Sequence, residues 1–292
     1  MISRPLRFNV HQRTRRRVRI DYGQLLTHVV LLSFGFLYVF PFLWMLASSL
    51  KSNAEYFNQG LSLIPGSWQW SNYVKAWSIG RFSTYFLNSV MVTLSVVVLV
   101  NLFTSMAGYA LAKLPIPGKK AFLIGIAILM FLPKGNLILP TLEIMRALRL
   151  TNTLWAIIIL QTAGGMLGNT FLFMGFFRTV HREIEEAAIM DGATTSQMYW
   201  KIMLPLARPM IATVTLLTAI GSWNDFFTPL VMTFNRPELR TLAVAMFYFQ
   251  QTETRDWVAL CAAATISLLP IILVFVFLQR FFIEGMSGAI KS

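Results

Sequence analysis

Four long stretches of the chain contain no Asp, Glu, Lys or Arg: residues 22–50, 82–112, 150–177 and 257–279. Each can cross the ~30 Å hydrocarbon core of a bilayer, which takes about 20 helical residues. Of the 292 residues, 56% are hydrophobic and 13% are charged, and this composition excludes a soluble domain of the same length. The pattern therefore predicts a protein whose helices cross a membrane.

Two further apolar stretches are less regular. Residues from about 121 to 145 are interrupted by Pro133 and Lys134, and residues from about 209 to 233 contain Asp225. Counting both, we predict an all-α integral membrane protein with six transmembrane helices. The predicted organisation is a basic N-terminal arm, a six-helix transmembrane domain and a short C-terminal tail, at residues 1–24, 25–283 and 284–292.

Six helices place both termini on one side of the membrane, and the basic residues indicate which side. If the N-terminus is cytoplasmic, the cytoplasmic segments hold sixteen Lys and Arg residues and the outside segments hold nine. Loops rich in Lys and Arg remain in the cytoplasm. We therefore expect both termini and the polar segment 178–208 to be cytoplasmic.

The N-terminal arm contains seven arginines between Arg4 and Arg19. Such a run could bind nucleic acid, but beside six apolar spans it is better explained as a topology signal that also contacts anionic membrane lipid. The first apolar span is longer than the roughly 7–15 residues of a signal-peptide core, so we expect a retained helix. Membrane lipid is a predicted partner and nucleic acid is not.

The polar segment 178–208 contains a spaced pattern, E-A-A-x3-G-x9-I-x-L-P, which begins at Glu186 and ends at Pro205. An acidic, Ala-rich start favours a short helix, and Gly192 can adopt the left-handed conformation that ends one. Thr194 or Thr195 can cap a second short helix, on which we expect Met198, Tyr199 and Trp200 to form an exposed docking surface. The alternative is an amphipathic connector lying at the membrane interface.

This spaced pattern resembles the cytoplasmic loop of the membrane permease subunits of bacterial carbohydrate ABC importers, in the maltose-type branch of smaller permeases. The resemblance implies the type I ABC importer transmembrane fold and the bacterial inner membrane. It implies that the 183–205 loop couples the chain to ATPase subunits. The coupling residues it assigns are Glu186, Ala187, Ala188, Asp191, Gly192, Ile202, Leu204 and Pro205.

The same resemblance implies the partners. They are a second homologous permease, two ATP-binding cassette subunits, and a periplasmic or lipid-anchored solute-binding protein. ATP and Mg would be bound by the ATPase subunits, so no cofactor is expected on this chain. The outside loop at 235–257 would meet the docked solute-binding protein.

Signatures of catalysis are missing from the sequence. It contains neither a G-x4-G-K-[ST] phosphate-binding loop nor an H-E-x-x-H zinc motif, and its three histidines are far apart. The single cysteine, Cys261, excludes an internal disulfide and a Cys metal cluster. We predict no catalytic residue, no metal site and no ATP hydrolysis by the chain alone.

Polar residues inside the apolar spans are candidates for the translocation path, because buried polar groups in lipid normally face a bundle interior or a cavity. The Ser222-Trp223-Asn224-Asp225-Phe226 stretch resembles a sequence common in the carbohydrate branch. Two simpler roles stay open: helix-end capping for Asp225, and close helix packing for the Gly-rich span around Gln161 and Asn169. The candidates in these two spans are Gln161, Asn169, Trp223, Asn224 and Asp225.

Lys134 is the remaining unusual residue, because it falls in the outer third of the bilayer beside Asn136. It can extend to the outer headgroups, or both residues can lie on the path, where a cation would favour an anionic sugar such as a uronate oligosaccharide. We therefore predict a permease for an oligosaccharide or related sugar, with a lean towards an anionic one. The alternatives are an importer of a polyol phosphate or other non-sugar solute, an intramembrane enzyme and a channel.

Overall fold

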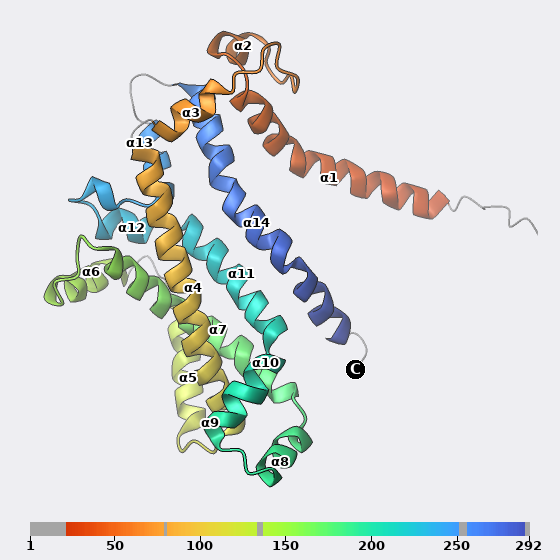
Figure 1. Ribbon diagram of the computed structural model, residues 1–292, viewed down its shortest axis with the longest axis vertical. Coiled ribbons are helices and arrows are strands. Elements are labelled where there is room, and N and C mark those ends of the chain that lie inside the picture. Colours follow the sequence, from red (N-terminus) through yellow and green to blue (C-terminus); the bar gives the residue numbers. More distant parts are fainter. Residues whose placement is uncertain (1–21, 79–80, 133–136, 251–255, 290–292) are drawn as a thin grey trace, which may run out of the picture. The chain divides into compact units, whose positions relative to one another are not determined.

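A computed structural model of the protein describes residues 22–78, 81–132, 137–250 and 256–289 (Figure 1). These segments are almost entirely helical and contain no strand, which confirms the predicted all-α class. The elements are α1 (Tyr22–Ser49), α2 (Asn53–Asn58), α3 (Ser71–Ser78), α4 (Phe82–Lys113), α5 (Lys119–Met130), α6 (Ile138–Ala147), α7 (Leu154–Thr179), α8 (Arg182–Met190), α9 (Thr195–Gln197), the π-helix η3 (Met198–Met203), α10 (Leu204–Leu206), α11 (Arg208–Asn224), α12 (Phe227–Met232), the 3-10 helix η4 (Pro237–Leu239), α13 (Leu242–Gln250) and α14 (Trp257–Ala289).

The chain divides into two compact units, residues 1–44 and 45–292. The described part of the first unit is most of α1, whose apolar side chains are exposed on all sides. A helix that is hydrophobic all round belongs in lipid or against another membrane helix. The predicted arm at 1–24 lies almost wholly outside the described residues, and α14 continues through the predicted tail boundary at 283.

Four described helices are long and apolar enough to cross a membrane: α1, α4, α7 and α14. A fifth crossing is possible in α9–α10 together with α11, a pair bent by 73° at Ala207. Pro209 stands in the first turn of α11, where its missing N–H is not needed. The bend therefore separates the predicted coupling loop from the apolar helix that follows it.

The two spans that the sequence marked as irregular are not continuous helices. The predicted 121–145 span corresponds to α5, which ends at Met130, and α6, which begins at Ile138; residues 133–136 between them lie outside the described part of the chain. The predicted 209–233 span ends as α11 at Asn224, and α12 begins at Phe227. The cause of the second break is local: the Asp225 carboxylate accepts hydrogen bonds from the backbone amides of Phe227 and Thr228, which starts a new helix.

The core of the second unit forms where α4 packs against α7. At Gly108 an added Cβ would lie 2.5 Å from Phe173 Cβ and 2.9 Å from the Met174 nitrogen, so only glycine allows this approach. A Cβ on Gly165 would lie 3.0 Å from Val100 Cγ2. The packing role predicted for the Gly-rich span is confirmed at Gly165. Buried side chains around this contact include Val92, Val96, Val100, Phe173, Phe177 and Met203.

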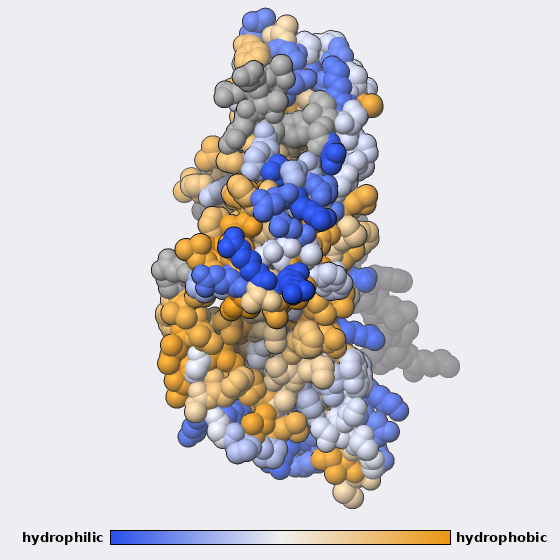
Figure 2. All heavy atoms as spheres, turned by 90° about the vertical axis from the view of Figure 1, so that its left-hand side faces the viewer, coloured by the Kyte–Doolittle hydropathy of each residue, from blue (hydrophilic) through white to orange (hydrophobic). Residues whose placement is uncertain are grey.

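The surface of the molecule matches this architecture. Figure 2 shows hydrophobic side chains spread over much of one face, with a band of hydrophilic side chains across its middle and further hydrophilic side chains at its upper and lower ends. Large apolar side chains such as Leu94 and Val98 on α4 are more than half exposed. Exposed apolar side chains in such number suit contact with lipid or with another membrane subunit.

Candidate translocation groove and coupling loop

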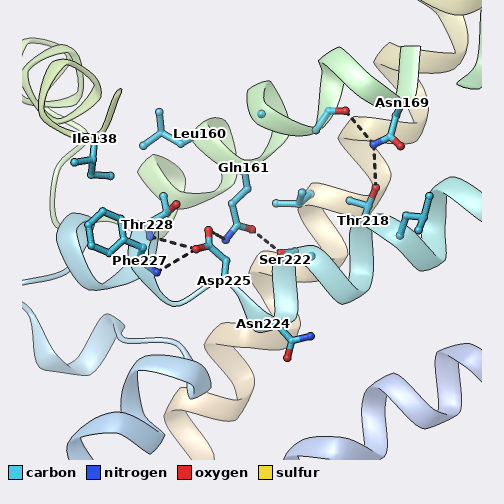
Figure 3. A pocket seen from close by; sticks show the side chains of 15 residues that line it. Ile138, Leu160, Gln161, Asn169, Thr218, Ser222, Asn224, Asp225, Phe227 and Thr228 are labelled. Atoms are coloured by element: carbon cyan, nitrogen blue, oxygen red, sulfur yellow. Dashed lines mark hydrogen bonds between the residues drawn. The ribbon is translucent and has the colours of Figure 1, made fainter. Parts of the chain in front are cut away.

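A groove of about 610 Å³ lies between α7 and the end of α11 (Figure 3). Amide, hydroxyl and carboxylate groups alternate on its wall with aliphatic side chains and bare glycine backbone. A second hollow of about 630 Å³ adjoins it and shares part of its lining. The residues common to both are Ile138, Leu160, Gly164, Gly165, Asn169 and Thr228.

Gln161 is the centre of the polar wall. Its Nε2 donates to Asp225 Oδ2 at 2.9 Å, and its Oε1 accepts from the Ser222 hydroxyl at 2.6 Å (Figure 3). Thr93 Oγ1 on α4 lies 3.3 Å from the same Ser222 hydroxyl. Both atoms of the amide are therefore used, and the network joins α4, α7 and α11 at one level.

Asp225 has two roles at this level. Its Oδ2 accepts from Gln161, while its Oδ1 accepts from the amides of Phe227 at 3.1 Å and Thr228 at 3.3 Å. The sequence left helix capping and a path position as alternatives. Asp225 both caps α12 and lines the groove.

Of the other path candidates, some line the groove and others do not. Asn169 lines the groove, where its Nδ2 donates to the Gly165 carbonyl at 2.9 Å and lies 3.5 Å from Thr218 Oγ1. Asn224 also lines it and lies apart from the Gln161 network (Figure 3). Trp223 does not: it is 7% exposed, its Nε1 donates to the Ser267 carbonyl at 3.0 Å, and it packs within the core. Lys134 and Asn136 lie outside the described residues.

The candidates did not include the hydroxyl groups of this wall, from Thr218, Ser222 and Thr228. A signal for two of them was present. Thr218, Ser222 and Asp225 follow each other at intervals of four and three residues, so they share one face of a helix. Together with Asn169 and Gln161 they form a wall of short polar groups.

The predicted coupling loop begins with α8, and this helix ends as the sequence predicts. Gly192 has φ of +78°, its amide donates to the Ile189 carbonyl at 2.9 Å, and the Ala193 amide donates to the Ala188 carbonyl at 2.9 Å. These two bonds form a Schellman motif, which satisfies carbonyls at the end of the helix. Ala188 lies on the buried side of α8, whereas Ala187 and Asp191 are exposed.

Glu186 projects from α8 on the exposed side. Its ion-pair partner among the described residues is Arg182, one helical turn earlier, with Arg182 Nε and Glu186 Oε1 3.0 Å apart and both side chains exposed. Such a surface pair contributes little to stability, so Glu186 remains available to another protein.

The second half of the loop corrects one prediction. Of the two predicted caps, Thr194 is the one that caps α9, in a reciprocal capping box with Gln197. The helix then widens into the π-helix η3, and Met198 and Tyr199 are buried in the core instead of exposed. Their sequence neighbourhood predicted an aromatic docking surface, but packing against α4 and α7 buries this face. The large exposed apolar side chains between residues 183 and 205 are instead Ile184, Ile189, Met190, which is 86% exposed, and Trp200.

Ile202, Leu204 and Pro205 end the predicted pattern. Ile202 and Leu204 are half-buried against the main core, and Pro205 is exposed before the bend at Ala207. Among the described residues no group of three or more His, Cys, Asp or Glu side chains could hold a metal ion.

Residues 19–288 match the family described as binding-protein-dependent transport system inner membrane component. The chain belongs to this family. It is therefore an inner-membrane permease that works in an ABC transporter with a solute-binding protein and an ATPase. Its relatives are permeases and not themselves enzymes, as the sequence predicted.

Two relatives and one solved structure resemble this permease along most of its length. It is 35% identical over 265 residues to the probable ABC transporter permease protein YurM of Bacillus subtilis, covering 89% of this chain and 87% of the relative. It is 32% identical over 260 residues to the diacetylchitobiose uptake system permease protein NgcG of Streptomyces coelicolor, covering 87% and 84%. A chain in the crystal structure of a bacterial ABC transporter involved in the import of the acidic polysaccharide alginate is 28% identical, with a TM-score of 0.77 over 92% of this permease and 100% of that chain. The predicted type I importer fold is confirmed.

Proposed function

We propose that this permease forms half of the translocation path of an ATP-driven sugar importer, and that the Gln161 groove is part of that path. The observation that carries the proposal is the wall of amide and hydroxyl groups, beside bare glycine backbone, at the level where α11 ends. Sugars are recognised by hydrogen bonds to neutral polar groups, and a path needs bonds that form and break easily. The sugar relatives support this cargo class.

The cargo's charge is a separate part of the proposal. Among the described residues that line the groove there is no Lys or Arg, and the Asp225 carboxylate is already bonded to three donors. The lean towards an anionic oligosaccharide rests on Lys134 and on the likeness to the alginate importer chain. On this proposal Lys134, beside Asn136, supplies the cation that the groove wall lacks.

The proposed complex has four membrane-associated chains, two permeases and two ATPase subunits, and the loop at 183–205 contacts an ATPase subunit in the cytoplasm. The bias in Lys and Arg supports cytoplasmic N- and C-termini. The exposed Glu186, Met190 and Trp200 support α8 and η3 as the contact surface, because an apolar patch with a charged rim is typical of a docking site.

Uptake by the complex reconstituted in proteoliposomes tests both the role of the groove in transport and the preference for an anionic sugar. Gln161→Leu should reduce uptake of neutral and uronate oligosaccharides alike, because it removes both hydrogen-bonding atoms at the centre of the wall. Lys134→Met should reduce uptake of the uronate sugar about ten- to a hundredfold more than uptake of a neutral sugar of equal length. This is the change in affinity expected from the loss of one desolvated charged contact. Equal losses on both sugars for Lys134→Met would remove the anionic lean and leave the groove intact.

A further inference from the structure

Helix α4 carries buried polar contacts at both of its ends, and these contacts reach segments that are remote in sequence. From Asn88 to Lys113 the helix spans about 38 Å at 1.5 Å per residue. Its last turn is bonded to the start of the coupling loop, and its second turn is bonded to the segment 238–242. No chain connection joins α4 directly to either segment.

The C-terminal end of α4 is attached through Lys113. Its ammonium group forms an ion pair with Glu185 on α8 and donates to the Val180 carbonyl at 2.8 Å. The two charged side chains are only 12% and 18% exposed. Removing one partner of a buried ion pair leaves the other charge uncompensated, so this contact holds α8 in one position against α4.

A second contact fixes the later half of the coupling loop. The hydroxyl groups of Ser105 and Tyr199 lie 2.7 Å apart in a buried site, and the Tyr109 ring packs against Tyr199 with centroids 5.5 Å apart. Tyr199 belongs to η3, so both halves of the loop are attached to the same helix. A displacement of the loop must therefore move α4 or break these bonds.

The N-terminal end of α4 is attached through Asn88 and Ser89, which are both buried. Asn88 Nδ2 donates to the carbonyls of Glu238 at 2.9 Å and Arg240 at 3.0 Å. Ser89 Oγ accepts from the Leu242 amide at 2.8 Å. These three bonds hold the loop around η4 by its backbone, so they fix its shape independently of its side chains.

We propose that α4 is the mechanical link between the coupling loop and the loop around η4, with Lys113 and Asn88 as the positioning residues at its two ends. The inference rests on the proposed function, in which the coupling loop meets the ATPase, and on the expectation that the outside loop at 235–257, which contains η4, meets the solute-binding protein. The loaded binding protein shifts the η4 loop, the shift moves α4, and the coupling loop moves with it. Coupling between two sites needs such an element with contacts to both.

The test is ATP hydrolysis by the complete complex in lipid nanodiscs, measured with and without sugar-loaded binding protein. Lys113→Met and Asn88→Leu should each leave basal hydrolysis unchanged and reduce the stimulation at least about fivefold, the lower end of typical coupling between sites. Lys113→Arg, which keeps the charge and the donors, should retain stimulation. Lys120→Met is the matched control, because Lys120 is exposed on α5 and forms no ion pair with any described residue.

Each outcome decides the proposal. Full stimulation in Lys113→Met or Asn88→Leu overturns the link, and so does an equal fall in basal and stimulated hydrolysis, which would assign the residues to ATPase docking. If Lys113→Met fails to assemble, Glu185→Gln removes the same ion pair with little change in size and must show the same loss of stimulation. A wild-type complex that neither transports sugar nor responds to the binding protein would instead overturn the proposed function.

Discussion

At the scale of single residues, glycine is required at position 192 because of the backbone conformation and not because a larger side chain would lack space. Its φ is +78°, and a Cβ built there would meet no atom within 4 Å. A left-handed conformation costs an L-residue about 1–2 kcal/mol, least for Asn and more for a β-branched residue. We expect Gly192→Val to lose most ATP-driven uptake and Gly192→Asn to keep most of it, with similar amounts of protein in the membrane. Equal uptake by the two variants would contradict the requirement for this turn.

Glu186 is exposed, so its charge can be inverted with little effect on folding; surface changes of this kind are usually within about 0.5 kcal/mol. Glu186→Lys should nonetheless prevent binding of the ATPase subunits, because it places a cation at the proposed contact. Co-purification of the tagged permease with the ATPase subunits measures this. Glu183→Lys, an exposed acid on the same helix, is the control. Loss of binding in both variants would assign the effect to net charge instead of to Glu186.

The sequence was sufficient for residues whose role is local. Gly192 ends α8 and Thr194 caps α9, because a left-handed position and a capping box depend on neighbours in the chain. It was not sufficient for Met198 and Tyr199, which are buried by contacts with α4 and α7 that no local pattern specifies. For the same reason Trp223 is a core residue although it stands between two residues that line the groove.

At the scale of elements, the contact between α4 and α7 depends on Gly108. A Cβ at this position would come within 2.5 Å of Phe173 Cβ and 2.9 Å of the Met174 nitrogen, so the helices would have to separate. Gly108→Ala should destabilise the protein by about 1–3 kcal/mol, as overpacked cores do. Thermal unfolding in detergent checks this, with Gly175→Ala on α7 as the control, because no atom lies within 4 Å of its added Cβ. Similar melting temperatures for the two variants would contradict the packing.

The long helices were also predictable as elements. The charge-free stretches 22–50, 82–112 and 150–177 agree closely with α1, α4 and α7, because a membrane span is specified by its own composition. Of the two irregular spans, the second broke at Asp225, whereas in the first α5 ends at Met130, before Pro133, which lies outside the described residues. What the sequence did not reveal is that Asp225 replaces the lost backbone bonds with its carboxylate and so begins α12.

At the scale of the whole molecule, the groove and the coupling loop belong to one chain and require partners to act. The groove is an open hollow on α7, α11 and α12, which fits a wall of a path completed by a second permease. Sequence reasoning reached the family from the spaced loop motif. It named Gln161, Asn169, Asn224 and Asp225 as path candidates, and all four line the groove, but hydrogen bonds such as those of Gln161 to Asp225 and Ser222 depend on helices that meet only in the fold.

The most direct test of the central claim is sugar accumulation in proteoliposomes that contain this chain, a second permease and two ATPase subunits, with the loaded binding protein on the opposite face from ATP. The account predicts that labelled oligosaccharide accumulates only when ATP is present on the side of residues 178–208. It also predicts that Glu186→Lys abolishes the accumulation while the permease remains in the membrane. Accumulation without ATP, or undiminished accumulation in Glu186→Lys, would contradict it.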